Sequence, residues 1–161
     1  MRVTAKQGQL RRVWGSAVVI AVALIVATSA RAADLVSYTV VDNERITEAL
    51  TAEPGDPVRG RAAVIHRQKG NCLACHMLPI PEEQFHGDTG PTLVGVGARY
   101  DAGELRLRIV NSKIVNPETM MPAFYRVEGL HRVGAKFKDI PMLSAQEVED
   151  VVAYLLTLTE D

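Results

Sequence analysis

The sequence predicts an all-α fold in which three main helices are joined by long loops. Three stretches carry a capping residue followed by apolar residues at helical spacing, and they begin near residues 57, 101 and 144. The stretches between them are rich in proline and glycine, which interrupt regular structure. Only 5% of the 161 residues are aromatic. An apolar cofactor enclosed by the loops would therefore help to complete the core.

The first 32 residues have the layout of a secretory signal peptide. Four basic residues precede an apolar run at 13–27, and small residues follow it. Cleavage is expected after Ala32, and a cut after Ala30 or Ala33 also fits the pattern. The run is shorter than the roughly 20 residues that span a bilayer, which favours a cleaved leader over an anchor. We therefore expect export to the periplasm and a mature chain without a membrane span.

Removal of this leader changes the charge balance. It takes away five of the 18 basic residues and none of the 19 acidic ones, so the mature chain has 13 basic side chains and a net charge of −6. Nucleic-acid-binding domains usually carry a basic patch or stripe. The mature composition therefore disfavours a nucleic-acid partner.

Residues 33–56 are predicted to form an N-terminal arm, and residues 57–161 the folded domain. The arm contains no long apolar period, and a cluster of breakers closes it at residues 53–57. It either wraps around the domain or docks onto a partner, and residues 37–41 form a short strand or lie extended. The first helix is expected to start at Pro57, with Asp56 as N-cap, and to end at Gly70.

The other two helices begin with a capping box. Asp101 and Glu104 open the second, which is expected to end at Asn111-Ser112, and Ser144 with Glu147 opens the last. The last helix has a wide apolar face made by Val148, Val151, Val152, Leu155, Leu156 and Leu158. Residues 77–97 between the first two helices are predicted to form a loop, and a loop of this length is usually functional.

The chain has two cysteines, and both lie in the segment Cys72-Leu-Ala-Cys75-His76. This spacing is the attachment pattern of a c-type haem. Each thiol can form a thioether with one vinyl group of the porphyrin, and His76 is then placed to ligate the iron. No cysteine remains for a disulfide or a zinc site. A thiol–disulfide oxidoreductase that uses the same pair is the alternative, but it needs a βαβ setting that the sequence does not show.

A methionine is the expected ligand on the opposite face of the iron, where it raises the reduction potential. Met121 lies 45 residues after His76, which is ample chain to pass around a ring about 10 Å across. Because Pro122 restrains this loop, we prefer Met121 and keep Met120 as the second choice. A distal histidine is the alternative, supplied by His86 or His131.

Two strong iron ligands leave no vacant coordination position. Such a haem passes electrons and does not activate small molecules, so no catalytic residue is expected in this chain. Arg99, at the end of a glycine-rich stretch, is a candidate partner for a haem propionate, and a solvated surface charge is the alternative.

The chain resembles class I cytochromes c, and among them the SoxX subunits of the SoxAX complexes of bacterial sulfur oxidation. The resemblance rests on residues 69–100, 115–133 and 143–158. The patterns CxxCH, GPxLxGV and MPxF occur in many cytochromes c. The insertion PIPEEQFHGD and the continuation FYRVEGLHRV are more particular to the SoxX subunits.

The resemblance implies a class I cytochrome c-like fold around one covalent haem c, and a periplasmic heterodimer with a SoxA-type cytochrome. Such complexes join thiosulfate oxidatively to a cysteine of the carrier SoxYZ, an L-cysteine S-thiosulfotransferase activity whose sulfur chemistry belongs to SoxA. This chain would be the electron-accepting subunit and would pass electrons to a downstream acceptor. The resemblance also implies that the Pro91 carbonyl contacts His76. A free-standing periplasmic electron shuttle is the alternative, although the segments 79–88 and 126–142 favour a partner-bound subunit.

Overall fold

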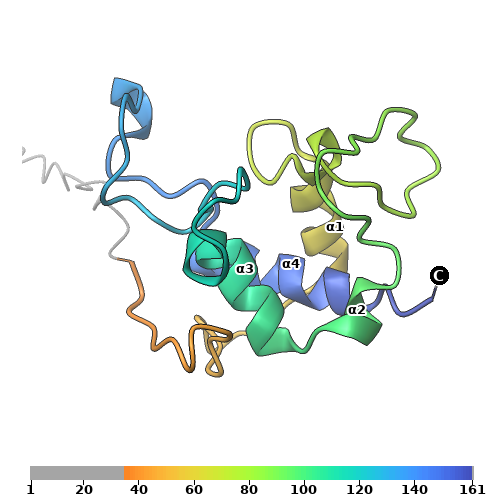
Figure 1. The fold of residues 1–161 in the computed structure, drawn as a ribbon, viewed down its shortest axis with the longest axis horizontal. Coiled ribbons are helices and arrows are strands. Elements are labelled where there is room, and N and C mark those ends of the chain that lie inside the picture. Colours follow the sequence, from red (N-terminus) through yellow and green to blue (C-terminus); the bar gives the residue numbers. More distant parts are fainter. Residues whose placement is uncertain (1–34, 161) are drawn as a thin grey trace, which may run out of the picture. The chain divides into compact units, whose positions relative to one another are not determined.

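Helices supply the regular structure in the computed structural model, which describes residues 35–160 (Figure 1). In chain order the elements are α1 (Pro57–Ile65), the 3₁₀ turn η1 (Cys72–Ala74), α2 (Val96–Arg99), α3 (Ala102–Val115), the 3₁₀ turn η2 (Ala135–Phe137) and α4 (Ala145–Leu156). Over this range no strand forms, and the only β-type pairing is an isolated bridge between Val41 and Arg45. The predicted all-α class is confirmed.

The predicted leader at residues 1–32, with its cleavage sites, lies outside the described residues. Among the helices of residues 35–160, none has the length and hydropathy needed to cross a membrane.

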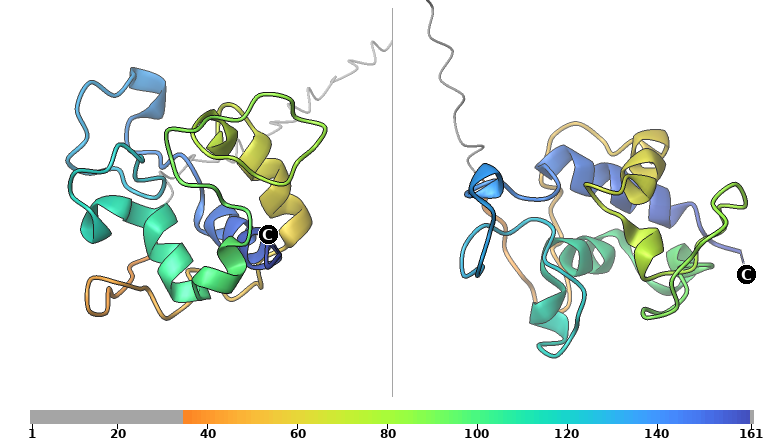
Figure 2. Two further views of the ribbon diagram at one scale, coloured as in Figure 1. Left: turned by 45° about the vertical axis from the view of Figure 1, so that its right-hand side comes forward. Right: turned by 90° about the horizontal axis from the view of Figure 1, so that it is seen from above.

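Helices α1 and α4 pack directly against each other, as Figures 1 and 2 show from three directions. Gly60 of α1 lies at the contact, where a Cβ atom would be 1.9 Å from the carbonyl oxygen of Asp150. A side chain at this position would push the helices apart, so the absence of one permits the close approach. Val64 and Val151 are buried in the core that the two helices share.

A buried carboxylate joins the start of α1 to α4. Asp150, with 3% of its side chain exposed, accepts hydrogen bonds from the Asp56 amide at 2.8 Å and from Arg59 Nε at 2.7 Å. Burial raises the pKa of the Asp150 carboxyl, but the hydrogen bond from Arg59 and those from Asp56 and Gln146 lower it, and the net pKa lies below its usual value. The folded state therefore favours the charged form.

The depressed pKa of Asp150 predicts a loss of stability in acid. A carboxyl group with a lower pKa in the folded state contributes stability above its unfolded pKa of about 3.9, and this contribution disappears as the pH falls through the folded value. We expect Asp150→Asn to be less stable than the parent at pH 7 and the difference to shrink below about pH 4. Urea unfolding of both proteins from pH 7 to pH 3 measures this difference. A difference that stays constant over that range would contradict the linkage.

The N-terminal arm wraps around the domain and forms part of its core. Ile46 and Leu50 of the arm are buried, with 0% and 4% of their surface exposed. An ion pair from α3 to α4 lies beneath them, in which Arg106 Nε and Nη2 donate to the Glu149 carboxylate at 2.7 and 2.8 Å. The same pair holds the arm, since Arg106 Nη1 donates to the Ile46 carbonyl and Glu149 accepts from the Leu50 amide.

The predicted end of the first helix at Gly70 is wrong by five residues. Helix α1 ends at Ile65, and His66 adopts an extended conformation after it. The chain then turns back, so that the Gly70 amide donates to the Ala63 carbonyl at 3.2 Å. A Cβ at Gly70 would be 2.6 Å from that oxygen. The glycine therefore closes a turn against the helix instead of ending it.

Three other boundaries differ from the prediction. Helix α3 continues to Val115, although Asn111 has non-helical angles (φ −158°, ψ 84°) and breaks it close to the predicted end. The short helix α2 begins inside the loop expected at 77–97. Helix α4 ends at Leu156, two residues before the end of the predicted apolar face.

Candidate functional site

Cys72, Cys75 and His76 lie on one tight turn that follows α1. The amides of Cys75 and His76 both donate to the Cys72 carbonyl, at 3.1 and 2.9 Å. Both cysteines are free thiols; Cys75 is exposed and Cys72 is partly buried. An ion pair between Lys69 and Glu147 ties the start of the segment to the first turn of α4.

The imidazole of His76 is oriented by the main chain of residues 90–91. Its Nδ1 atom lies 2.6 Å from the Pro91 carbonyl oxygen, and the Gly90 amide donates to the Cys75 carbonyl at 2.8 Å. A Cβ at Gly90 would be 2.4 Å from Cε1 of the ring, so this close approach requires glycine. A carbonyl oxygen only accepts, so Nδ1 carries the proton. The lone pair of Nε2 is therefore available to a metal.

The environment of Cys72 disfavours thiol redox chemistry. Burial raises the pKa of the Cys72 thiol to about 12, so the thiol is protonated at neutral pH. Reactive cysteines of CxxC motifs instead have a lowered pKa. The turn also lies beside helices, with no strand in the described part of the chain to supply a βαβ unit. These observations weigh against the oxidoreductase alternative.

The two candidate methionines differ in burial. Met121 is partly buried and packs against the hydrophobic core, whereas 79% of Met120 is exposed. The Met121 carbonyl accepts a hydrogen bond from Ser112 Oγ of α3 at 3.0 Å. The Met121 main chain is therefore held by α3, which favours Met121 over Met120 as the predicted sulfur ligand.

The two histidines of the alternative are placed differently. Nδ1 of His86 accepts from the Leu78 amide at 3.2 Å, and the next residue, Gly87, donates to the Leu73 carbonyl at 2.7 Å. His86 is thus held close to the attachment segment. His131 is exposed in the long connection between α3 and α4. A distal histidine therefore stays the alternative prediction to Met121.

Arg99 binds the loop that precedes it. Its guanidinium group donates to the carbonyls of Val94 and Thr92 at 2.7 and 2.8 Å. The residue is nevertheless exposed. These contacts order residues 92–94, and a contact between Arg99 and a propionate stays a prediction.

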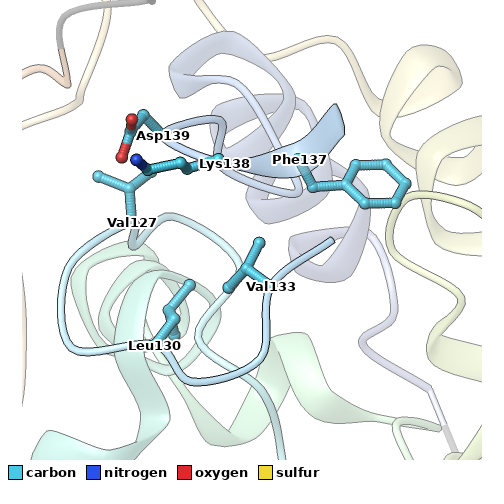
Figure 3. A pocket seen from close by; sticks show the side chains of 6 residues that line it. All are labelled: Val127, Leu130, Val133, Phe137, Lys138 and Asp139. Carbon is cyan, nitrogen blue, oxygen red and sulfur yellow. The ribbon is translucent and has the colours of Figure 1, made fainter. Parts of the chain in front are cut away.

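The connection between α3 and α4 carries the exposed apolar side chains Leu130, Val133, Phe137, Ile140 and Met142. A hollow of about 260 Å³ opens within it, lined by Val127, Leu130, Val133, Phe137, Lys138 and Asp139 (Figure 3). Figure 3 shows the Phe137 ring pointing away from Val127 and Leu130. The segment from 126 to 142 has four basic and two acidic residues in a mature chain that is acidic overall.

Comparison with known proteins identifies the family. The family model described as cytochrome c matches residues 59–159. The chain belongs to the cytochrome c family. It is a cytochrome with covalently attached haem c that carries electrons.

Two relatives are similar to this cytochrome over different lengths. A chain in the crystal structure of SoxXA from P. pantotrophus is 37% identical, with a TM-score of 0.72, and the match covers 76% of the cytochrome and 95% of that chain. Cytochrome c-550 from Bacillus subtilis (strain 168) is 28% identical over 82 residues, which are 51% of the cytochrome and 64% of the relative. The match thus spans less than two thirds of the Bacillus protein.

The residues of the turn fit a haem. Two free thiols lie one turn apart, and the imidazole beside them has Nε2 directed away from its hydrogen bond. Two buried polar atoms in the described chain, Nε2 of His86 and Oδ1 of Asn111, have no hydrogen-bond partner. Such atoms are rare, and His86 is held close to the attachment segment by the hydrogen bond that its Nδ1 accepts from Leu78. Haem iron supplies one-electron chemistry when bound, and Cys72, Cys75 and His76 would hold and orient it.

The sequence did not point to two residues near this site. Gly90 lies against the His76 ring, where a side chain would not fit. Ser112 was expected only as a helix end, but it hydrogen-bonds the main chain of Met121. Nothing in the residues around Ser112 indicates that its hydroxyl group donates to a carbonyl nine residues later in the chain.

Proposed function

We propose that this cytochrome is the periplasmic, electron-accepting subunit of a SoxAX-type complex. The observation that carries the proposal is the 37% identity to a chain of the SoxXA structure, over 95% of that chain. The haem would be attached to Cys72 and Cys75. His76 and Met121 would be its axial ligands.

The contacts around these residues support the ligand assignment. The Pro91 carbonyl sets the tautomer of His76 that leaves Nε2 free. An N–H donor that is hydrogen-bonded in this way also makes the imidazole a better ligand. Met121 is preferred over Met120 because its side chain packs against the core while Met120 is largely exposed.

The reaction of the complex would release two electrons. Thiosulfate and a carrier cysteine thiol would form a sulfur–sulfur bond, and one proton and two electrons would leave. The partner's haem would carry out this step. A single haem accepts one electron at a time, so this chain would pass the two electrons on in succession to a downstream acceptor. It needs no substrate site of its own, and with both cysteines bound to haem it has no sulfur nucleophile.

The exposed side chains of the connection at residues 126–142 favour the role of a complex subunit over that of a free-standing electron shuttle. Five of its large apolar side chains are between 41% and 55% exposed. Contiguous exposed apolar surface often marks a protein–protein interface. Its four basic residues would favour a partner surface with acidic character.

Reconstitution tests this proposal. The full chain is expressed with haem maturation in the periplasm, alone and together with the SoxA-type cytochrome of the same organism, and purified. We expect a one-to-one complex whose haem in this chain is reduced by thiosulfate only when the partner and the carrier protein are both present. A cytochrome that stays monomeric and is reduced equally well without the partner would support the shuttle instead.

A matched pair of variants adds a control. Leu130→Glu places a charge on the exposed connection, and Val58→Glu places one on α1, where Val58 is 77% exposed. We expect only Leu130→Glu to weaken the complex. Equal effects of the two charges would count against an interface at 126–142.

A further inference from the structure

Ser112 of α3 holds the segment that carries Met121. The residue is 6% exposed, and its Oγ atom donates to the Met121 carbonyl at 3.0 Å. A buried hydroxyl directed at one main-chain atom restrains the loop more than a solvent-exposed contact would, because water does not compete for it.

The break in α3 beside Ser112 holds the chain that follows Met121. In an unbroken helix the carbonyls of Ile109 and Val110 face the amides four residues later. Beside the non-helical Asn111 they accept from the amides of Phe124 and Tyr125, at 3.1 and 3.3 Å. The irregular part of α3 is thus paired with the methionine segment.

The chain before Met121 is held as well. Lys113 Nζ donates to the Thr119 carbonyl at 2.6 Å, and the Met121 amide donates to Thr119 Oγ1 at 3.2 Å. The Met121 main chain is therefore bonded at its own amide and carbonyl, and these contacts leave the side chain available as the ligand that the proposed function would require.

We propose that Ser112 is a positioning residue for the Met121 sulfur. Its hydrogen bond fixes the peptide from which the sulfur extends, so that the sulfur occupies the axial position for a larger fraction of the time. This inference rests on the proposed function, because it takes Met121 as the axial ligand. Lys113 restrains the same loop through the Thr119 carbonyl, and its effect is weaker because this contact is exposed to water.

Competition by imidazole measures the effect. Added imidazole binds the ferric iron only when the methionine is displaced, so its apparent affinity rises as the methionine bond weakens. We expect Ser112→Ala to bind imidazole about fivefold more tightly than the parent cytochrome, which is the factor expected for one lost hydrogen bond. The charge-transfer band of the methionine-ligated ferric haem reports the same displacement.

Two further variants separate positioning from general destabilisation. Thr157→Val removes a hydroxyl that donates to the Tyr154 carbonyl at 2.6 Å at the end of α4, and it should leave imidazole binding unchanged. Lys113→Met removes an exposed contact without disturbing the core, and it should tighten imidazole binding about twofold. If Ser112→Ala does not fold, the imidazole affinity of Lys113→Met is the test of whether contacts to this loop position the sulfur. The inference would be overturned if Ser112→Ala and Lys113→Met bound imidazole no more tightly than Thr157→Val does.

The ligand assignment is tested separately by Met121→Ala. Loss of the methionine band in Met121→Ala, with no effect of Ser112→Ala or Lys113→Met, would reject the positioning role and retain the ligand. A band that persists in Met121→Ala would reject the ligand itself, and the positioning role with it.

Discussion

Met121→Ala is expected to abolish methionine ligation and to lower the reduction potential while the protein stays folded. Methionine raises the potential of a c-type haem. We expect a decrease on the order of 0.1 V, within the range of roughly 0.8 V that axial ligands span. Visible spectroscopy and a redox titration of the purified cytochrome measure both effects.

Met120→Ala is the matched control. Its side chain is 79% exposed, so the spectrum and potential should stay those of the parent. If Met120→Ala changed the spectrum and Met121→Ala did not, the choice between the two methionines would be wrong. If neither variant changed it, His86 or His131 would be the ligand to test next.

Arg106→Met is expected to destabilise the fold by about 3–5 kcal/mol, the usual cost of removing one partner from a buried ion pair. Arg106 and Glu149 are each 5% exposed, so the substitution leaves a buried carboxylate without its cation. It also removes the hydrogen bond from Arg106 to the Ile46 carbonyl, which holds the N-terminal arm. Denaturant unfolding of the oxidised cytochrome measures the loss.

Arg45→Met provides the comparison on the surface. Arg45 pairs with Asp101 at 2.7 Å, but both side chains are well exposed. Exposed pairs contribute about 0–1 kcal/mol, so this variant should lose little. The double variant Arg106→Met/Glu149→Met should recover part of the stability, because no unpaired charge remains. Equal losses for Arg45→Met and Arg106→Met would show that the buried pair has no special role.

The helix starts were predictable from the sequence because their signals are local. Asp56, Asp101 and Ser144 each cap the helix that the sequence assigned to them. A capping side chain bonds amides two or three residues later, so the pattern and the contact lie in the same short stretch. The helix ends were less predictable. The Gly70 amide donates to the carbonyl of Ala63 in the last turn of α1, and the sequence pattern of a helix stop does not distinguish this contact from a true helix end.

The contacts around the site could be predicted only in part. The spacing of Cys72, Cys75 and His76 is itself the signal for haem attachment. The contact between His76 and the Pro91 carbonyl was expected from the family resemblance and is present, although periodicity and composition do not indicate it. The hydrogen bonds of Ser112 and Lys113 to the methionine segment had no sequence signal, and Arg99 binds its own loop.

By itself the sequence determined the helical class and the attachment motif, and it predicted which segment would offer a second ligand. Each of these depends on residues within a few positions of one another, or on the type of side chain alone. The tertiary structure decided that the N-terminal arm belongs to the core and that the break in α3 holds the methionine segment. It also decided which carbonyl orients His76. These outcomes depend on pairs far apart in the chain, such as Arg106 and Glu149. A buried polar group must find its partner wherever the fold brings one within reach.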